Sequence, residues 1–262
     1  MSRNRAGTRP RGGFFFGGLM AACLVACAPL PEQRAGIPTR WEPSPNHNHR
    51  RPNFVIIHHS GDDSAMETLR TLADPIRAVS AHYLIGRDGT IYQLVDERAR
   101  AWHAGDSRWG SSTDINSSSL GIELDNNGAE PFPEAQIRAL LELLADIKKR
   151  YRIPAANFLG HADVAPARKA DPSRHFPWKK LAESGFGLWC DPPYPERQSP
   201  LDATIALRAL GYDVSDVAAA LRAFKSHFAQ DDSEPVLTGR DRDLLHCLLQ
   251  RGSRLATDPG RD

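Results

Sequence analysis

An uninterrupted apolar run followed by two histidines constrains the fold of this chain more than any other feature. Residues 54–57 are Phe-Val-Ile-Ile, and His58 and His59 follow directly. The length and the β-branched content of this run predict a buried strand. Functional groups of α/β proteins commonly lie at the C-terminal ends of such strands. Because successive side chains of a strand point to opposite faces, only one of the two histidines can join a given site.

The elements that follow alternate between strands and helices. Residues 80–85 and 90–95 are apolar runs on either side of Asp88-Gly89, and this arrangement predicts a β-hairpin. Residues 119–125 predict a further strand. The clearest helix is expected over Pro133–Tyr151, because its apolar residues recur at intervals of three and four.

A second region of different texture follows. A proline-rich linker is expected at residues 189–200. Beyond it, the pattern predicts a small all-α three-helix domain over residues 201–252 and a tail at 253–262. A domain of this size is marginally stable alone. The three helical stretches are Asp202–Leu210, Ser215–Phe228 and Thr238–Leu249.

The N-terminus has the features of a bacterial lipoprotein signal. Four arginines and no acidic residue accompany Phe14–Ala26, an apolar stretch too short to span a bilayer. Leu24-Val25-Ala26-Cys27 resembles the lipobox, whose cysteine is acylated and becomes the first mature residue. We expect a signal peptide at 1–26, a lipid on Cys27 and a flexible Pro- and Arg-rich tether at 27–52. An ordinary cleaved signal with an incidental cysteine is the alternative.

The expected destination is the outer membrane, facing the periplasm. Ala28 stands where retention in the inner membrane would favour aspartate. In an oxidising periplasm Cys190 and Cys247 could form a disulfide. Two partly buried thiols are the alternative, and the sequence leaves both open. No Cys-x-x-Cys pair is present, so we expect no structural zinc knuckle.

The charge of the chain argues against a nucleic-acid partner. The net charge is +1 with histidine neutral, and removal of the four arginines of the signal leaves 1 − 4 = −3. Neither value indicates a polybasic surface.

A polar loop at residues 160–172 gathers His161, Lys169 and Asp171. Loops of this kind commonly carry function. Zinc catalysis needs about three protein ligands and an open position for water. His161 and Asp171 offer two ligands, and His58 is the best candidate for the third. A zinc-bound water has a pKa of about 7, so hydroxide is available at neutral pH.

Two further residues complete a set for amide hydrolysis. Glu123 interrupts the apolar run of its strand, and a carboxylate is costly to bury unless something needs it. It is the candidate for taking the proton of the water and passing it to a leaving amine; a solvent-facing position is the alternative. Lys169 is the candidate cation for the charge that develops on the carbonyl oxygen.

Five stretches together resemble a known family. The type-2 N-acetylmuramoyl-L-alanine amidases, zinc enzymes related to peptidoglycan-recognition proteins and to phage T7 lysozyme, carry similar motifs in the same order over roughly residues 50–185. The stretches are Val55–His58, Ser80–Ile85, Trp102–Gly105, Ser119–Glu123 and Gly160–Pro172.

The resemblance implies a zinc amidase domain over residues 53–188, with an α/β fold in which helices flank a mixed central β-sheet. It implies zinc on His58, His161 and Asp171, with His58 favoured over His59, and catalytic roles for Glu123 and Lys169. The residues that line or brace the substrate cleft are expected to be His82, Trp102 and His103.

The implied reaction is hydrolysis of the amide between N-acetylmuramic acid, or its anhydro form, and L-alanine of the stem peptide during wall turnover. The AmiD-like outer-membrane lipoproteins look most similar within the family. Residues 200–250, through Leu207–Tyr212 and Ala223–Phe228, resemble a small helical peptidoglycan-binding domain. Expected partners are peptidoglycan or muropeptides and the outer membrane, without nucleic acid, and we expect a monomer. The alternative is a non-catalytic recognition lipoprotein, against which Glu123, Lys169 and the three ligands together argue. The lipobox argues against a phage-type lytic enzyme, because an anchored enzyme would not be released to lyse the cell.

Overall fold

The computed structural model describes residues 36–42, 44–49, 52–197 and 200–257. These residues belong to one unit of the chain, Glu32–Asp262. The expected signal peptide and Cys27 lie outside the described residues. Within the described residues, no helix combines the length and the apolar character needed to cross a bilayer.

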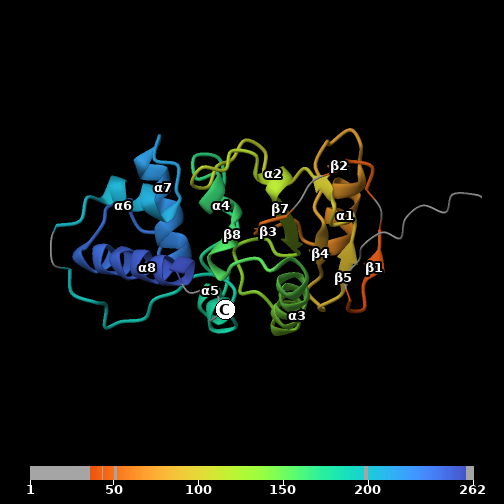
Figure 1. Ribbon diagram of the computed structural model, residues 1–262. Coiled ribbons are helices and arrows are strands. Elements are labelled where there is room, and N and C mark those ends of the chain that lie inside the picture. The colour runs from red at the N-terminus through yellow and green to blue at the C-terminus, as the bar shows by residue number, and fades with distance from the viewer. Residues whose placement is uncertain (1–35, 43, 50–51, 198–199, 258–262) are drawn as a thin grey trace, which may run out of the picture. The chain divides into compact units, whose positions relative to one another are not determined.

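A mixed six-stranded sheet forms the centre of the first domain (Figure 1). The strands follow the order β1-β5-β4-β7-β3-β8. Only the β4–β5 hairpin is antiparallel, and the other neighbours in this sheet pair in parallel. The expected hairpin, the buried strand at 54–57 and the strand at 119–125 are thereby confirmed. The strands are β1 (Arg40–Trp41), β3 (Phe54–His59), β4 (Tyr83–Ile85), β5 (Ile91–Gln93), β7 (Ser119–Leu124) and β8 (Phe158–Gly160).

Alternation along β3 divides the core between the two faces of the sheet. Val55 and Ile57 pack in one apolar cluster with the stripe of α3 (Glu134–Tyr151), the helix expected from the sequence. Phe54 and Ile56 pack on the other side with Ile115 of α2 (Ile115–Ser118). His58 shares the parity of Phe54 and Ile56, so its side chain leaves the strand away from α3.

Shorter helices complete this domain. They are α1 (Ala65–Ala73), the 3₁₀ turn η1 (Ala155–Asn157), α4 (His161–Val164) and α5 (Trp178–Glu183).

Part of the expected tether is in fact bound to the sheets. β1 pairs in parallel with β5, and β2 (His47–His49) pairs antiparallel with β6 (Ala99–Ala101) in a separate two-stranded sheet. Between them, the backbone N–H of Ser44 donates to the carbonyl of Leu94 at 2.8 Å. The expectation of a flexible tether is therefore wrong for the strands at residues 40–41 and 47–49. These strands attach through backbone hydrogen bonds to exposed sheet edges, a mode of pairing that leaves no apolar periodicity in so short a segment.

The C-terminal region contains the three expected helices. They bury an apolar cluster with Leu207, Phe224 and Leu245 at its centre, and Ala162 of α4 belongs to the same cluster. The last helix runs beyond Gly252 into the expected tail, since a single glycine costs only about 1 kcal/mol in a helix. The elements are α6 (Ala203–Leu210), α7 (Val217–Phe224), the π-helical turn η2 (Lys225–Ala229) and α8 (Gly239–Thr257).

A disulfide joins the linker to this helical domain. The Sγ atoms of Cys190 and Cys247 lie 2.01 Å apart, and the two Cα atoms 6.3 Å apart. This bond settles the alternative that the sequence leaves open.

Candidate active site

Three neighbouring parallel strands bring their polar residues to one edge of the sheet. His58 of β3 is the register partner of Glu123 of β7, so the two side chains leave the sheet side by side on the same face. On the other side of β3, Ile57 pairs with Gly160, the last residue of β8, and His161 follows at once. The C-terminal ends of parallel strands meet at one edge of a sheet, and this topology places residues far apart in the sequence together.

The three expected ligands converge at this edge. The Nδ1 atoms of His58 and His161 lie 2.9 Å apart, and Asp171 Oδ2 lies 3.2 Å and 3.1 Å from them. Ligand atoms of a tetrahedral zinc site are about 3.3 Å apart for metal–ligand distances of about 2.0 Å. The spacing of these three side chains suits a metal ion, which is true of no other group of three histidine, cysteine, aspartate or glutamate side chains among the described residues.

A chain of hydrogen bonds determines which nitrogen of His58 faces this cluster. Ser119 Oγ–H donates to the carbonyl of Ile115 at 2.6 Å, so its oxygen accepts from His103 Nε2–H at 3.1 Å. His103 Nδ1 then accepts from His58 Nε2–H at 3.1 Å. The Nδ1 lone pair of His58 is therefore directed at the cluster, as metal ligation requires.

A backbone carbonyl orients His161 in the same way. Its Nε2–H donates to the carbonyl oxygen of Ala104 at 3.2 Å, which leaves the Nδ1 lone pair for a metal. Arg168 holds the same loop, since its Nη2 donates to the Ala104 carbonyl at 2.9 Å and its Nε to the Asp106 carbonyl at 3.0 Å. Two lone pairs and one carboxylate oxygen thus face one another, and this donor set fits a divalent cation.

The protonation of these groups agrees with that fit. Burial, followed by the charge of His161, lowers the pKa of His58 to about 4, so its ring is neutral at pH 7. Burial alone would raise the pKa of Asp171, but its contacts with His161 and His58 outweigh burial and lower the pKa well below its usual range. A neutral imidazole and an ionised carboxylate are the forms that bind metal.

Glu123 has the environment of a proton-transfer group. Its Oε2 atom is buried and has no hydrogen-bond partner among the described residues. Burial, with a further contribution from the charge of Asp171, raises the pKa of Glu123 to about 8. A carboxyl group with such a pKa exchanges protons readily near neutral pH. Glu123 is half-buried, and it lines the same cavity as His58, His161 and Asp171.

One cavity of about 260 Å³ collects the groups expected to perform the chemistry. His58, His161, Asp171, Glu123 and Lys169 all line it, and Trp102 and His103 line it as well. A second cavity of about 460 Å³ shares His59 and Lys169 with it. The two cavities therefore adjoin at these residues.

His82, expected with Trp102 and His103 to line or brace the cleft, is not among the residues that line the first of these cavities. It is fully buried, its Nδ1 accepts from the backbone N–H of Gly121 at 3.0 Å, and its Nε2 donates to the carbonyl of Ala99 at 3.1 Å. Both ring nitrogens thus bind backbone groups, and His82 braces the strands. His59 also lies apart from the metal cluster, and its Nδ1 accepts from the backbone N–H of Ser173 at 3.2 Å.

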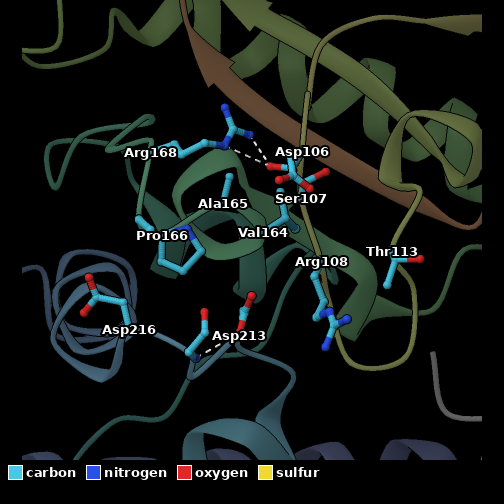
Figure 2. A pocket seen from close by; sticks show the side chains of 12 residues that line it. Asp106, Ser107, Arg108, Thr113, Val164, Ala165, Pro166, Arg168, Asp213 and Asp216 are labelled. Atoms are coloured by element: carbon cyan, nitrogen blue, oxygen red, sulfur yellow. Dashed lines mark hydrogen bonds between the residues drawn. The ribbon is translucent and has the colours of Figure 1, made fainter.

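A third cavity, of about 310 Å³, lies away from this chemistry. Figure 2 shows its lining residues, which are 106–108 and 113, 164–168, and 213, 215 and 216, with the guanidinium of Arg168 pointing toward Asp106. Lys169 and the metal cluster do not line it, so we assign it no part in the reaction.

Sequence reasoning missed the residues that hold the ligands in place. Ser119 and Arg168 stand beside expected residues in the sequence, but their roles depend on loops brought close by the fold. A glycine inside a strand indicates that another group approaches the backbone closely, and Gly121 is such a glycine. A Cβ atom at this position would lie 2.4 Å from the ring of His103, so glycine leaves room for that ring.

Comparison with known proteins agrees with this geometry. A family model described as N-acetylmuramoyl-L-alanine amidase matches residues 48–174. The N-acetylmuramoyl-L-alanine amidase AmiD of Escherichia coli is 38% identical over 210 residues, which are 68% of this chain and 75% of that protein.

Solved structures of related proteins extend the similarity into the helical region. E. coli AmiD, in complex with anhydro-N-acetylmuramic acid-L-Ala-D-γ-Glu-L-Lys, superposes with a TM-score of 0.69 at 34% identity, covering 78% of this chain and 90% of that one. AmpDh3 of Pseudomonas aeruginosa, in complex with anhydromuramic pentapeptide, gives a TM-score of 0.70 at 31% identity, covering 78% and 93%. From its sequence match, its fold and its converging site residues, the chain belongs to the N-acetylmuramoyl-L-alanine amidase family.

Proposed function

We propose that this protein is a zinc-dependent amidase that cleaves the bond between the lactyl group of N-acetylmuramic acid, including the anhydro form, and L-alanine of the stem peptide. The observation that carries this proposal is the convergence of three metal-ligand atoms with Glu123 and Lys169 in one cavity. The related structures bind anhydromuramoyl peptides, which contain this bond.

In this proposal His58, His161 and Asp171 hold the zinc ion. Zinc supplies an acidified water and polarises the substrate carbonyl when it is bound. Glu123 accepts a proton from the attacking water at its unpartnered Oε2 and delivers it to the leaving nitrogen of L-alanine. The Lys169 ammonium stabilises the negative charge on the carbonyl oxygen. Water is thus consumed, and the products are a lactyl carboxylate and a free α-amine.

The second cavity suits the peptide side of the substrate. Lys169, Arg174 and Arg222 bring three cations to its wall, with Asp232 as a single acid that pairs with Arg174 at 3.0 Å. In the substrate bound by the E. coli relative, D-glutamate is linked through its γ-carboxyl group, which leaves its α-carboxylate free beyond the scissile bond. We assign this cavity to the stem peptide, with the cations facing its carboxylates.

The lipobox-like sequence at the N-terminus supports a proposal for the cellular location. We infer a lipoprotein anchored through Cys27 in the outer membrane, facing the periplasm and acting as a monomer in wall turnover. The helical domain would add a second contact with peptidoglycan and so raise the local substrate concentration.

A digestion of defined muropeptides tests the reaction. The chain from residue 28, which retains the whole unit Glu32–Asp262, is incubated with anhydromuramoyl peptides with zinc and with a chelator, and products are followed by mass spectrometry. Free stem peptide together with peptide-free sugar, lost on chelation, is the expected result. Binding of zinc and muropeptide without cleavage would instead return the protein to the class of non-catalytic recognition lipoproteins.

A further inference from the structure

A buried carboxylate connects the metal-ligand helix to the helical domain. Asp163 lies two residues after His161 in α4, and only 1% of its surface is exposed. Its Oδ2 accepts from the backbone N–H of Gly160 at 2.7 Å, so the side chain closes back over the start of α4. The first N–H groups of a helix have no partner within the helix, and Asp163 supplies one.

Two side chains of the helical domain complete the coordination of this carboxylate. The hydroxyl of Tyr212, just after α6, donates to Asp163 Oδ1 at 2.5 Å. His227 of η2 places its Nδ1 at 2.7 Å from Asp163 Oδ2. Burial, with the charge of Asp163 next, raises the pKa of Tyr212 well above its ordinary value, so the phenol keeps its proton and donates.

Both donors are themselves held in place by rings. The imidazole of His227 stacks on Trp178, with centroids 3.7 Å apart and planes 18° apart, and on Phe228 at 3.8 Å. The Nε2 atom of His227 is buried without a hydrogen-bond partner among the described residues. The imidazole is therefore held on its polar side through Nδ1, which contacts Asp163. Tyr212 packs edge-on against Trp109 of the amidase domain, 4.9 Å between centroids.

The metal-ligand helix is too short to hold itself. α4 has four residues, a single turn, and an isolated turn of helix is unfavourable. Its second residue, Ala162, is buried within the apolar cluster of the helical domain, and the Ala162 N–H donates to the carbonyl of Asp171 at 2.7 Å. Consecutive residues of α4 thus face the metal cluster, the apolar core of the helical domain, and the Tyr212–His227 pair.

We propose that Tyr212 and His227 are positioning residues for the metal ligand His161, acting through Asp163, so that the helical domain is a structural part of the metal site. Without these two donors, the Asp163 carboxylate would remain buried with the Gly160 N–H as its hydrogen-bond donor. A buried charge with so few partners is strongly disfavoured. The side chain would then turn away, release Gly160 and loosen the turn that aims His161 at the metal. This inference rests on the zinc site of the proposed function but not on its substrate.

Zinc affinity measures this role directly. Tyr212→Phe removes the hydroxyl and keeps the ring, and His227→Phe keeps the stacking and removes the nitrogen. We expect each variant, as the chain from residue 28, to bind zinc about 10-fold to 100-fold more weakly in competition with a fluorescent chelator. Tyr194→Phe and His246→Gln are matched controls in the linker and on α8, and we expect both to bind zinc as the parent does.

A double-mutant cycle separates positioning from general destabilisation. If Tyr212 acts through Asp163, then Tyr212→Phe should change zinc affinity by less than about twofold in a chain that already carries Asp163→Ala. Circular dichroism at the assay temperature checks that each variant is folded.

Zinc affinities of Tyr212→Phe and His227→Phe within about twofold of the parent would overturn the proposal, whatever their effect on thermal stability. An equal loss in the Asp163→Ala background would overturn it as well. A parent that binds zinc but does not cleave muropeptides would contradict the proposed function and leave this measurement intact.

Discussion

Replacing Gly121 by alanine would test the hydrogen-bond chain that orients His58. A Cβ atom at position 121 would lie 2.4 Å, 2.5 Å and 2.7 Å from three ring atoms of His103, whereas ordinary contact begins at 3.4 Å. The ring must therefore move by about 3.4 − 2.4 = 1.0 Å. Such a shift breaks the 3.1 Å contact between His58 Nε2 and His103 Nδ1, because hydrogen bonds fail beyond about 3.5 Å.

Two magnitudes follow for Gly121→Ala. Overpacking of a buried site costs about 1–3 kcal/mol in the free energy of unfolding. Loss of the group that orients a metal-bound histidine weakens metal binding by about 10-fold to 100-fold. We expect both effects in the same variant, since the steric clash and the orienting contact involve the same ring.

Chemical denaturation and zinc competition measure these two quantities. Gly239→Ala is the matched control, because no atom lies within 4 Å of the position of its added Cβ. A Gly121→Ala protein with the stability and the zinc affinity of its parent would refute the role of His103 in aiming His58.

Four further predictions follow from the site and its supports. Glu123→Gln should lower kcat by about 10²- to 10⁴-fold while zinc still binds; retention of activity would remove Glu123 from the reaction. Burial raises the pKa of Glu123 from 4.5 to about 8, so the ionised carboxylate opposes folding and the protonated form favours it. In the metal-free protein, the stability that the protonated form contributes is therefore present at low pH and is lost as pH rises through about 8. The stability advantage of Glu123→Gln over its parent should therefore grow between pH 4.5 and about 8, by at most about 5 kcal/mol, in urea denaturation with a chelator present; a constant difference would contradict this reasoning. The Cys190–Cys247 bond closes a loop of 57 residues, so opening it should lower the free energy of unfolding by about 4 kcal/mol. Denaturation of the Cys190→Ser/Cys247→Ser protein and of the reduced parent would measure this loss. Equal stability of the oxidised and the reduced parent would count against the prediction. Arg222→Ala should raise KM for anhydromuramoyl peptides about threefold and leave kcat unchanged, whereas the control Arg138→Ala on α3 should change neither. An unchanged KM for Arg222→Ala would contradict the assignment of the second cavity to the stem peptide.

Local patterns were sufficient for the elements and for most of the site. The apolar run before His58, the turn at Asp88-Gly89 and the stripe of α3 each place an element without reference to the rest of the chain, because hydrophobic period and turn chemistry act over a few residues. The family motifs named His161 and Asp171 before any contact was visible, and the structure brings both to within 3.2 Å of His58.

The supports of the site were beyond local patterns. Ser119 reaches His103 across 16 positions, and Ala104 accepts hydrogen bonds from His161 and Arg168, which lie 57 and 64 positions away. Strands β1 and β2 attach through backbone groups, which every residue carries, so their composition does not reveal the pairing.

The sequence by itself determined which groups are the candidates for the chemistry, since a histidine or a carboxylate is a property of a single residue and the family motifs are local. It also placed His58 and Glu123 on strands, whereas His161, expected in a loop, begins the helical turn α4. Only the tertiary structure decided which nitrogen of each histidine faces the metal site and that Tyr212 and His227 reach Asp163 across 49 and 64 positions. The physical reason is that tautomers and buried hydrogen bonds depend on partners that folding brings from distant parts of the chain.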